Sequence, residues 1–480
     1  MMFKPKRLHP IAAAFSFAKS LKEWVFPIIL YFFFGPGDGA KMEWLYYLPF
    51  FFIGLLAVYG VIQWYRFTYS IEDEDLKIEQ GVFIRNKRYI PKKRIQSIDY
   101  SEGIIHRLFN VVKLNIETAG GAGRAEASLS AVNKKDAHLL VEHLRQNPDK
   151  MANAEEQIEK EQPTYQFKLS SKDLWIAAST SGGLGVVLSI VGTFGSQIDD
   201  ILPDDFVVGA VEWLSGFSWL LLVIMGISIL TVTWLLSFLG VILKYAGFSI
   251  KRYGDRIVIK RGLLEKRELT LPVKRIQGVR VVESVIRQPF GFATVHVESA
   301  GGTGADEGLS AMLFPIIKRS RINEELTQLL PGYFLPPKLN TLPNRSLKRY
   351  ILRAILPSFF LISLFWVIPK LWWILILLPV IALALLGILQ FKDGKWAVDR
   401  SSFYLQNRFI SRSLLITERK RMQHFEVKQS IFQRRTELAT IHTTVLSGGV
   451  GRQFNLTDTR VDDAKTVFNW YSRKVDVQQD

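Results

Sequence analysis

Residues 91–98 read PKKRIQSI, and two close relatives of this stretch follow later in the chain: PVKRIQGV from Pro272 and ERKRMQHF from Glu418. Each contains a basic-basic-apolar-glutamine core, and the intervals between the copies are far longer than any helix or strand period. Recurrence over such distances indicates a repeated structural unit. The repeated residues are Lys93, Arg94, Gln96, Lys274, Arg275, Gln277, Lys420, Arg421 and Gln423.

The repeat extends well beyond this motif. At a constant shift of 181 residues, residues 67–123 align with residues 248–304 without a gap, and the identities include Gly81/Gly262. A third copy, the most diverged, follows at a further shift of 146 residues. The chain therefore repeats one unit three times, and each unit consists of an apolar hairpin followed by a more polar module.

The modules have the sequence pattern of β-structure. FTYSIEDEDLKIEQGVFIRNKRYI from Phe67 and VVKLNIETAGGAG from Val111 alternate, are rich in β-branched and aromatic residues, and are interrupted by turn residues. Apolar residues at helical spacing predict a helix over residues 133–146, and RINEELTQLL from Arg321 and DDAKTVFNWYSRK from Asp462 occupy the same place in the other copies. We expect each module to be a small antiparallel sheet or barrel closed by a C-terminal helix.

Long apolar runs separate the modules. Five of them have roughly the 17–25 residues needed to cross about 30 Å of hydrocarbon, and they cover residues 44–65, 174–194, 217–243, 351–368 and 371–391. A sixth run, residues 21–34, is shortened by Lys22 and Glu23. A signal peptide is the alternative for this run, but it has no clean small-residue cleavage site and leads directly into the next run. We predict six spans in three hairpins and leave open whether the first run crosses fully.

The distribution of basic residues predicts the orientation. The chain has 61 Lys and Arg, and the short outer turns at residues 35–43, 195–216 and 369–370 contain only Lys41 and Lys370. The positive-inside rule therefore places both termini and all three modules in the cytoplasm. The net charge of +17 is largely a consequence of this topology. Nucleic-acid binding is disfavoured, because no aromatic-basic recognition motif accompanies the charge.

These patterns divide the chain into eight segments. The hairpins are residues 1–66, 173–244 and 351–391. The modules are residues 67–150, 245–332 and 392–480, and linkers occupy residues 151–172 and 333–350. The fold class is thus a multi-pass α-helical membrane protein with three transmembrane hairpins and three sheet-plus-helix modules.

The [KR]-I-Q segment and the TAGG and SAGG turns, beside an apolar hairpin, resemble the bacterial PH-like (bPH2) membrane-flanked domain family, particularly its large triplicated members. The resemblance covers essentially the whole chain and is lowest in the third copy, where Glu418 replaces a proline. It implies a pleckstrin-homology (PH) fold for each module, a bent seven-stranded antiparallel sheet with a C-terminal helix. It also implies a bacterial plasma-membrane protein, a small homologous membrane protein as partner, and a role in protection from membrane-active peptides.

The glutamines of the motif have a predicted structural role. In a regular strand alternate residues share a face, which places Gln96, Gln277 and Gln423 on the same side as apolar neighbours. A buried amide without partners costs about 1–3 kcal/mol. We therefore expect these side chains to point inward and to hydrogen-bond backbone groups of a neighbouring loop or strand end.

Lipid binding is a second interpretation of the basic residues. Eukaryotic PH domains bind lipid phosphates with basic residues in the first hairpin turn, but residues 72–75 of this chain are all acidic, which disfavours specific phosphoinositide binding. Weak attraction to an anionic leaflet adds about 1 kcal/mol for each basic residue near the surface. An equally good alternative to lipid attraction is that these basic residues only form a solvated surface on the cytoplasmic side. The candidate lipid contacts are Arg85, Lys87, Arg88, Lys266, Arg267 and Arg412.

The sequence contains no recognisable catalytic constellation. It has no cysteine, which excludes disulfides and thiolate metal sites, and none of its seven histidines form a ligand pair at i, i+4. The Gly-rich turns lack the Lys-Ser/Thr of a phosphate loop. We expect no cofactor, no metal and no enzymatic activity, and we favour a docking scaffold that supports membrane integrity, with a homo-oligomer left open. The alternative is a transporter, exporter or channel component for a lipid or peptide, although the five clear spans have no ionisable residues in their central parts.

Overall fold

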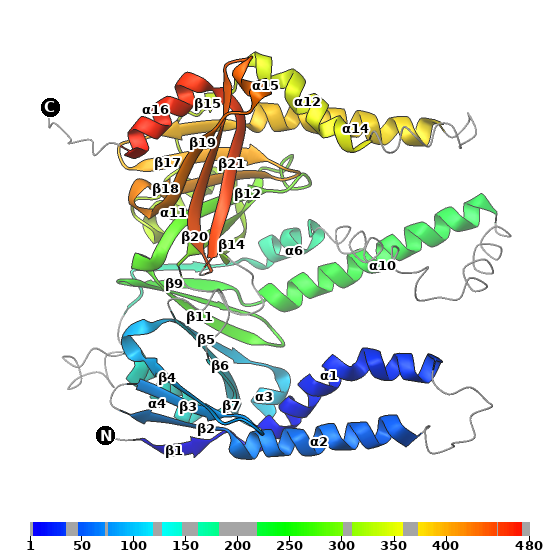
Figure 1. Cartoon of the computed structure of the whole chain (residues 1–480), viewed down its shortest axis with the longest axis vertical. Helices are drawn as coiled ribbons and strands as arrows, with labels where there is room; N and C mark the ends of the chain where they lie inside the picture. Colours follow the sequence, from blue (N-terminus) through cyan, green and yellow to red (C-terminus); the bar gives the residue numbers. More distant parts are fainter. Residues whose placement is uncertain are drawn as a thin grey trace.

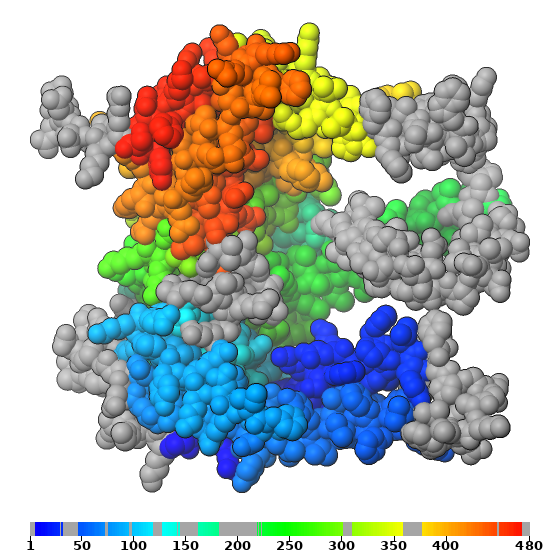
Figure 2. All heavy atoms as spheres, viewed as in Figure 1, coloured from blue at the N-terminus to red at the C-terminus, as the bar shows by residue number. Residues whose placement is uncertain are grey.

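The structure is a computed structural model, and it describes residues 3–34, 47–72, 75–118, 127–145, 162–181, 218–300, 310–358, 373–448 and 450–472. The three modules follow one another along the long axis of the molecule, and paired helices leave this stack on one side (Figure 1). The space-filling view shows the same arrangement, with the successive modules in contact (Figure 2).

Each module contains a four-stranded and a three-stranded antiparallel sheet. The three-stranded sheet of one module continues into the four-stranded sheet of the next, so the described strands form sheets of four, seven, seven and three strands. The first module has β1 (Phe3–Arg7), β2 (Thr68–Glu72), β3 (Asp75–Gln80) and β4 (Asn86–Pro91), then β5 (Ile95–Glu102), β6 (Val111–Thr118) and β7 (Ala127–Asn133). The second has β8 (Tyr165–Lys168), β9 (Ser249–Tyr253), β10 (Arg256–Arg261) and β11 (Lys266–Pro272), then β12 (Ile276–Glu283), β13 (Phe292–Ser299) and β14 (Ser310–Lys318). The third has β15 (Asn340–Thr341), β16 (Lys395–Val398), β17 (Ser402–Arg408) and β18 (Arg412–Glu418), then β19 (Met422–Lys428), β20 (Leu438–Ser447) and β21 (Val450–Arg460).

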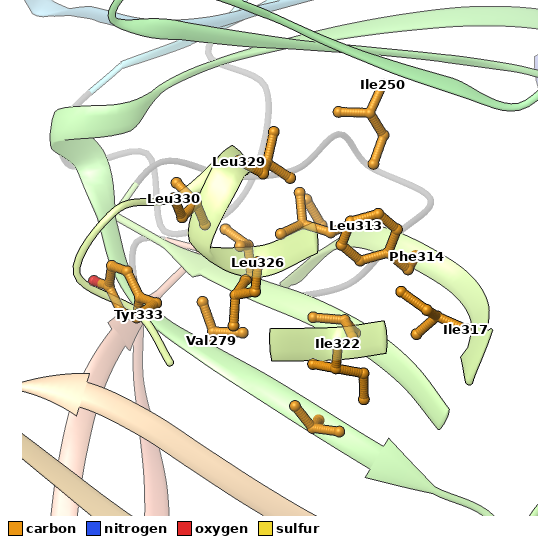
Figure 3. Close-up of a cluster of buried hydrophobic side chains, with 14 of the residues drawn as sticks. Ile250, Val279, Leu313, Phe314, Ile317, Ile322, Leu326, Leu329, Leu330 and Tyr333 are labelled. Atoms are coloured by element: carbon orange, nitrogen blue, oxygen red, sulfur yellow. The ribbon is translucent and has the colours of Figure 1, made fainter. Parts of the chain in front are cut away.

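A C-terminal helix completes each module, as the sequence predicts. These helices are α4 (Lys134–Arg145), α11 (Arg319–Leu329) and α16 (Val461–Ser472). In the second module, Ile322, Leu326 and Leu329 form one apolar stripe of α11, and they are buried together with Val279 of β12 and Leu313 of β14 (Figure 3). The core of each module therefore lies between its two sheets and beneath its helix.

The first strand of each module precedes the hairpin, which corrects the predicted boundaries. The strands β1, β8 and β15 pair with β2, β9 and β16, although a helical hairpin separates the two strands of every pair along the chain. Consequently the segments predicted as a pure hairpin (residues 1–66) and as linkers (residues 151–172 and 333–350) each contribute a strand. These strands have five, four and two residues, too few to show a clear alternation.

Three helix pairs correspond to the predicted hairpins. They are α1 (Ile11–Phe34) with α2 (Leu48–Arg66), α6 (Ser171–Ser179) with α10 (Trp219–Tyr245), and α12 (Leu347–Ile355) with α14 (Trp373–Asp393). Among the described residues, Leu48–Arg66 and Val223–Tyr245 are long and apolar enough to cross a membrane, and no residue of the apolar window in α10 is buried within the protein. Most of the predicted spans over residues 174–194 and 351–368 lies outside the described residues.

Candidate functional site: the junctions between modules

The repeated motif forms the corner between the two sheets of each module. A single turn of 3-10 helix, at Lys92–Arg94, Val273–Arg275 and Arg419–Arg421, connects the last strand of each four-stranded sheet to the first strand of the three-stranded sheet. The apolar residues Ile276 and Met422 of the motif are buried. The lysines Lys93, Lys274 and Lys420 are exposed. The motif is therefore architectural.

Neither Gln277 nor Gln423 is buried in a core. The register of β5, β12 and β19 with the neighbouring strand shifts between Ile95/Ser97, Ile276/Gly278 and Met422/His424, so that the glutamine is the additional residue of a β-bulge in every copy. A bulge interrupts the alternation of faces on which the inward prediction depended.

The side chains confirm this correction where they are described. Gln277 is half-buried and donates from Nε2 to the carbonyl oxygen of Arg275, two residues earlier, at 3.0 Å. Gln423 is exposed. The prediction of an inward amide is therefore wrong for Gln423. Gln277 makes the predicted hydrogen bond to a backbone group, but from a half-buried position. The side chain of Gln96 lies outside the described residues.

Neighbouring modules are joined edge to edge through their sheets. The strand β11 pairs with β5 of the preceding module, and β18 pairs with β12, each time antiparallel. Lys266 lies opposite Glu102 in the first junction, and Arg412 lies opposite Glu283 in the second. Glu102 and Glu283 are equivalent under the shift of 181 residues, and Lys266 and Arg412 are equivalent under the shift of 146 residues. The two junctions therefore have the same register and represent one repeated interaction.

An acidic residue at the end of each junction pairs with basic side chains. Glu102 accepts from Nζ of Lys134 at 2.7 Å, and Glu283 forms ion pairs with Arg319 and Arg412. Burial alone would raise the pKa of Glu102, but the hydrogen bond from Lys134 and the nearby charge of Lys266 contribute to lowering it. Burial alone would lower the pKa of Arg412, and its carboxylate partners raise it. Both junctions are thus closed by opposite charges.

Three of the candidate lipid contacts lie at these junctions. Lys266 and Arg412 lie opposite the junction glutamates, and Arg267 lies opposite Ser101 and pairs with Glu265 at 3.0 Å. The other three lie on or beside β4, at one end of the stack: Arg85, Lys87 and Arg88.

The two junctions differ in how the space between modules is filled. In the second, Tyr404, Leu414 and Ile416 project from the outer face of β17 and β18 and join the apolar core of the middle module. The first junction instead contains a cavity of about 580 Å³, and charged side chains including Lys134 and Arg261 line it. The second junction is therefore filled by apolar side chains, whereas the first contains a cavity with charged side chains in its lining.

The ends of the stack are also unlike. Within the described residues, β4 and β19 each pair on one side only. Arg88 of β4 is exposed where the equivalent Leu269 and Leu415 are buried, so the β4 end has the polar surface of a terminal repeat. At the β19 end Phe468, the eighth residue of α16, is 44% exposed, whereas the eighth residue of α11, Leu326, is buried. The chain thus has one polar end and one end with an exposed aromatic residue beside an open strand edge.

The family model described as Bacterial PH domain matches residues 25–148, 200–330 and 351–475. The chain belongs to this family. It is 36% identical over 493 residues to the UPF0699 transmembrane protein YdbT of Bacillus subtilis (strain 168), with 98% of this chain and 99% of that protein covered. No solved structure matches the chain. The family resemblance and the three copies are thus confirmed, and the relative supports a membrane location.

One position that sequence reasoning missed connects each bacterial PH domain to its hairpin. In the second domain Arg287, which precedes β13, donates to Oγ1 of Thr180 at 3.0 Å and to the carbonyl oxygens of Ala177 at 3.2 Å and Pro315 at 3.0 Å. Thr180 and Ala177 lie at the end of α6, and Pro315 lies on β14. The guanidinium therefore binds the hairpin and the sheet at once.

The equivalent residues in the other domains also connect the hairpin to its domain, but through different interactions. His106 stacks on Phe15 of α1, with ring centroids 4.5 Å apart. Gln433 donates to Oδ1 of Asp458 at 2.9 Å, and Oδ2 of Asp458 pairs with Arg353 of α12 at 2.7 Å. Histidine, arginine and glutamine share little beyond hydrogen-bonding capacity. Their equivalent positions in the repeat were therefore the only feature of the sequence that could have indicated this connection.

Proposed function

We propose that the chain is a non-enzymatic bacterial plasma-membrane scaffold, with three membrane-spanning hairpins and three cytoplasmic PH domains that form one docking platform. Three observations support the proposal. The helix pairs leave the stack on one side (Figure 1), two helices have the length and apolarity of a span, and the outer turns predicted from sequence are almost free of Lys and Arg.

The docking surface we propose is the open edge of β19. This strand is the equivalent of β5 and β12, and both of those strands bind the four-stranded sheet of a following domain in the same register. The repeated register is the observation that carries the proposal, because it defines which kind of strand fits β19. An exposed sheet edge binds a further strand through main-chain hydrogen bonds.

The partner we propose is a small homologous membrane protein that supplies a fourth four-stranded sheet. A second copy of this chain fits less well, because its own four-stranded edge is β4, with Lys87 and Arg88 exposed. If the partner pairs with β19 in the register of the two junctions, its residue equivalent to Arg412 lies opposite Gln429, which is the equivalent of Glu283. The assembly would support membrane integrity or protect the cell from membrane-active peptides.

Weak attraction to anionic lipid is a second, smaller part of the proposal. Arg85, Lys87 and Arg88 lie at the polar end of the stack, near the base of the first hairpin, where a basic group adds about 1 kcal/mol of attraction to an anionic leaflet. The pairing of Glu79 with Arg85 and Lys87 reduces their net charge, so we expect a small, salt-sensitive effect.

Photo-crosslinking in the native membrane tests the docking surface. A photoreactive amino acid is placed at His424 or Glu426 on the open edge of β19, and at Lys87 or Arg88 of β4 as a matched control on the other terminal strand. We expect adducts from the β19 positions with another bacterial PH domain protein, linked through its strand equivalent to β18. Mass spectrometry of the linked peptides identifies that strand.

The outcomes separate the alternatives. Adducts from β4 but not from β19 would place the partner at the wrong end and contradict the proposal. An adduct between β19 and β4 of a second copy would replace the small homologue with self-association. Adducts from β19 with proteins that lack a PH domain would exclude the edge-to-edge mechanism.

A further inference from the structure

Large apolar side chains are exposed in the same turn of every module. This turn connects the third and fourth strands of each four-stranded sheet, and we call its three copies the apolar turns. They present Phe83 and Ile84, Leu263 and Leu264, and Phe409 and Ile410, with Phe83 91% exposed and Phe409 82% exposed. Isolated exposed apolar residues are ordinary, but a repeated pair in equivalent turns marks an interaction surface.

Each apolar turn is fixed against the base of its hairpin. Arg66, the last residue of α2, donates to the carbonyl oxygen of Val82. The N–H of Leu263 donates to the carbonyl oxygen of Leu243 in α10 at 2.9 Å, and Nε2 of Gln390 in α14 donates to the carbonyl oxygen of Phe409 at 2.9 Å. The exposed side chains therefore lie where the apolar helices leave the modules.

The backbone of the turn is shaped to present these residues. Gly81 and Gly262 precede the apolar pairs and have φ of +117° and +100°. A Cβ at either position would lie 2.0 Å from the carbonyl oxygen of Ile84 or Glu265, respectively. Only glycine fits such a conformation, so the first two turns share one geometry.

Short helical segments extend the apolar surface between the turns. The helix α3 (Ile104–Leu108) exposes Ile104 and Leu108, and α15 (Ile431–Arg434) exposes Ile431, at 76%, and Phe432. Arg107 of α3 donates to the carbonyl oxygens of Leu263 and Leu264, which places α3 beside the apolar turn of the next module. Both α3 and α15 lie on the hairpin side of the stack (Figure 1).

We propose that the apolar turns and these short helices insert into the membrane interface, between the headgroups and the upper acyl chains of the leaflet on which the modules sit. The turns adjoin the ends of α2 and α10, and most apolar side chains of these helices are exposed. The apolar surface is therefore continuous with the segments proposed to cross the membrane, so the membrane is the partner that it fits. Basic residues beside the turns, such as Arg66 and Arg85, are then at headgroup level. The inference rests on the proposed spanning of the hairpins and is independent of docking at β19.

Site-directed spin labelling tests this insertion in the full chain. The protein contains no cysteine, so the variants Phe83→Cys, Leu264→Cys and Phe409→Cys each accept one nitroxide, with Phe468→Cys on α16 as the control. Phe468 is also an exposed phenylalanine, but α16 lies on the side of the stack away from the hairpins (Figure 1). The probe is a nanodisc of phosphatidylethanolamine and phosphatidylglycerol.

We expect oxygen, which concentrates in the bilayer, to relax the labels in the apolar turns more than a water-soluble nickel complex does, with the opposite order at residue 468. Equal access of the nickel complex to all four labels would overturn the inference. Labels shielded from both reagents would also overturn it, because a protein partner would then cover the turns. If a variant fails to fold, Ile84→Cys or Ile410→Cys replaces it in the same turn. Retention of the oxygen effect at high salt separates apolar insertion from charge attraction.

Discussion

His296 is a half-buried titratable residue of the middle module, and its Nδ1 atom is buried. It lies on β13 opposite Arg280 of β12. Burial lowers its pKa to about 3, and the positive charges of Arg280 and Arg452 contribute to the same effect. In the folded protein this imidazole is therefore neutral over the physiological range. The unfolded chain binds a proton at this residue near pH 6.5, so the histidine links stability to pH.

Acidification is expected to destabilise the protein through His296. Below pH 6.5 only the unfolded state takes up the proton, so this contribution is complete above pH 6.5 and is lost progressively down to about pH 3. For each pH unit below 6.5 the free energy of unfolding falls by about 1.4 kcal/mol, which amounts to about 2 kcal/mol at pH 5.0. The variant His296→Asn, which carries the residue found at the equivalent Asn115, is expected to lose less stability over this range. Thermal unfolding in nanodiscs from pH 7.5 to 5.0 measures the difference, and parallel curves would contradict it.

The bulged glutamines mark the limit of sequence reasoning at this scale. The repeat identified Gln96, Gln277 and Gln423 as equivalent residues, and their role in the architecture of the module was predictable. The direction of their side chains was not predictable, because one additional residue in a strand reverses the alternation of faces. No residue type in the motif predicts this bulge. The buried member of the motif is the apolar Ile276 or Met422.

Among the elements, local patterns were predictable and long-range pairings were not. The C-terminal helices α4, α11 and α16 follow from apolar spacing within a dozen residues. The strands β1, β8 and β15 follow from contacts across an entire hairpin, and their short sequences have no period of their own. The junction strand β11 has the same limitation, since its partner β5 belongs to another module. Tertiary context decides such pairings.

Removal of Arg287 is expected to loosen the second hairpin from its domain. Its guanidinium is partly buried and donates to Thr180, Ala177 and Pro315, so Arg287→Ala removes three hydrogen bonds that together join α6 to β14. Hydrogen bonds made by a charged group contribute about 1.5–3 kcal/mol, and we expect a loss of on the order of 3 kcal/mol in the free energy of unfolding.

A matched control in the same domain isolates this effect. Lys274→Ala removes a basic side chain whose ion pair with Asp255 is exposed, and such surface pairs contribute about 0–1 kcal/mol. Denaturant unfolding of both variants in the same detergent gives the comparison. Equal losses in the two variants would mean that Arg287 does not couple the hairpin to the sheet.

For the whole molecule, the two junctions set the order in which the stack opens. The second has six residue pairs in register between β12 and β18, and the apolar side chains of Tyr404, Leu414 and Ile416 fill it. The first has four pairs between β5 and β11 and contains a cavity of about 580 Å³ with charged side chains in its lining. Apolar burial stabilises by about 25 cal/mol per Å², so the second junction is the more stable one. The first domain is therefore expected to hinge away before the other two separate.

Hydrogen exchange by mass spectrometry measures this order in the intact protein. We expect amides of β5 and β11 that face each other to exchange earlier than those of β12 and β18, while the amides of β11 that face β10 remain protected by pairing within one domain. Substitution Ile416→Ala removes part of the apolar filling and should bring the exchange of β12 and β18 closer to that of the first junction, since a buried isoleucine truncated to alanine costs about 2–5 kcal/mol. Simultaneous exchange at both junctions in the wild type would instead show that the three domains open as one cooperative unit, and the different filling of the junctions would then have no energetic consequence.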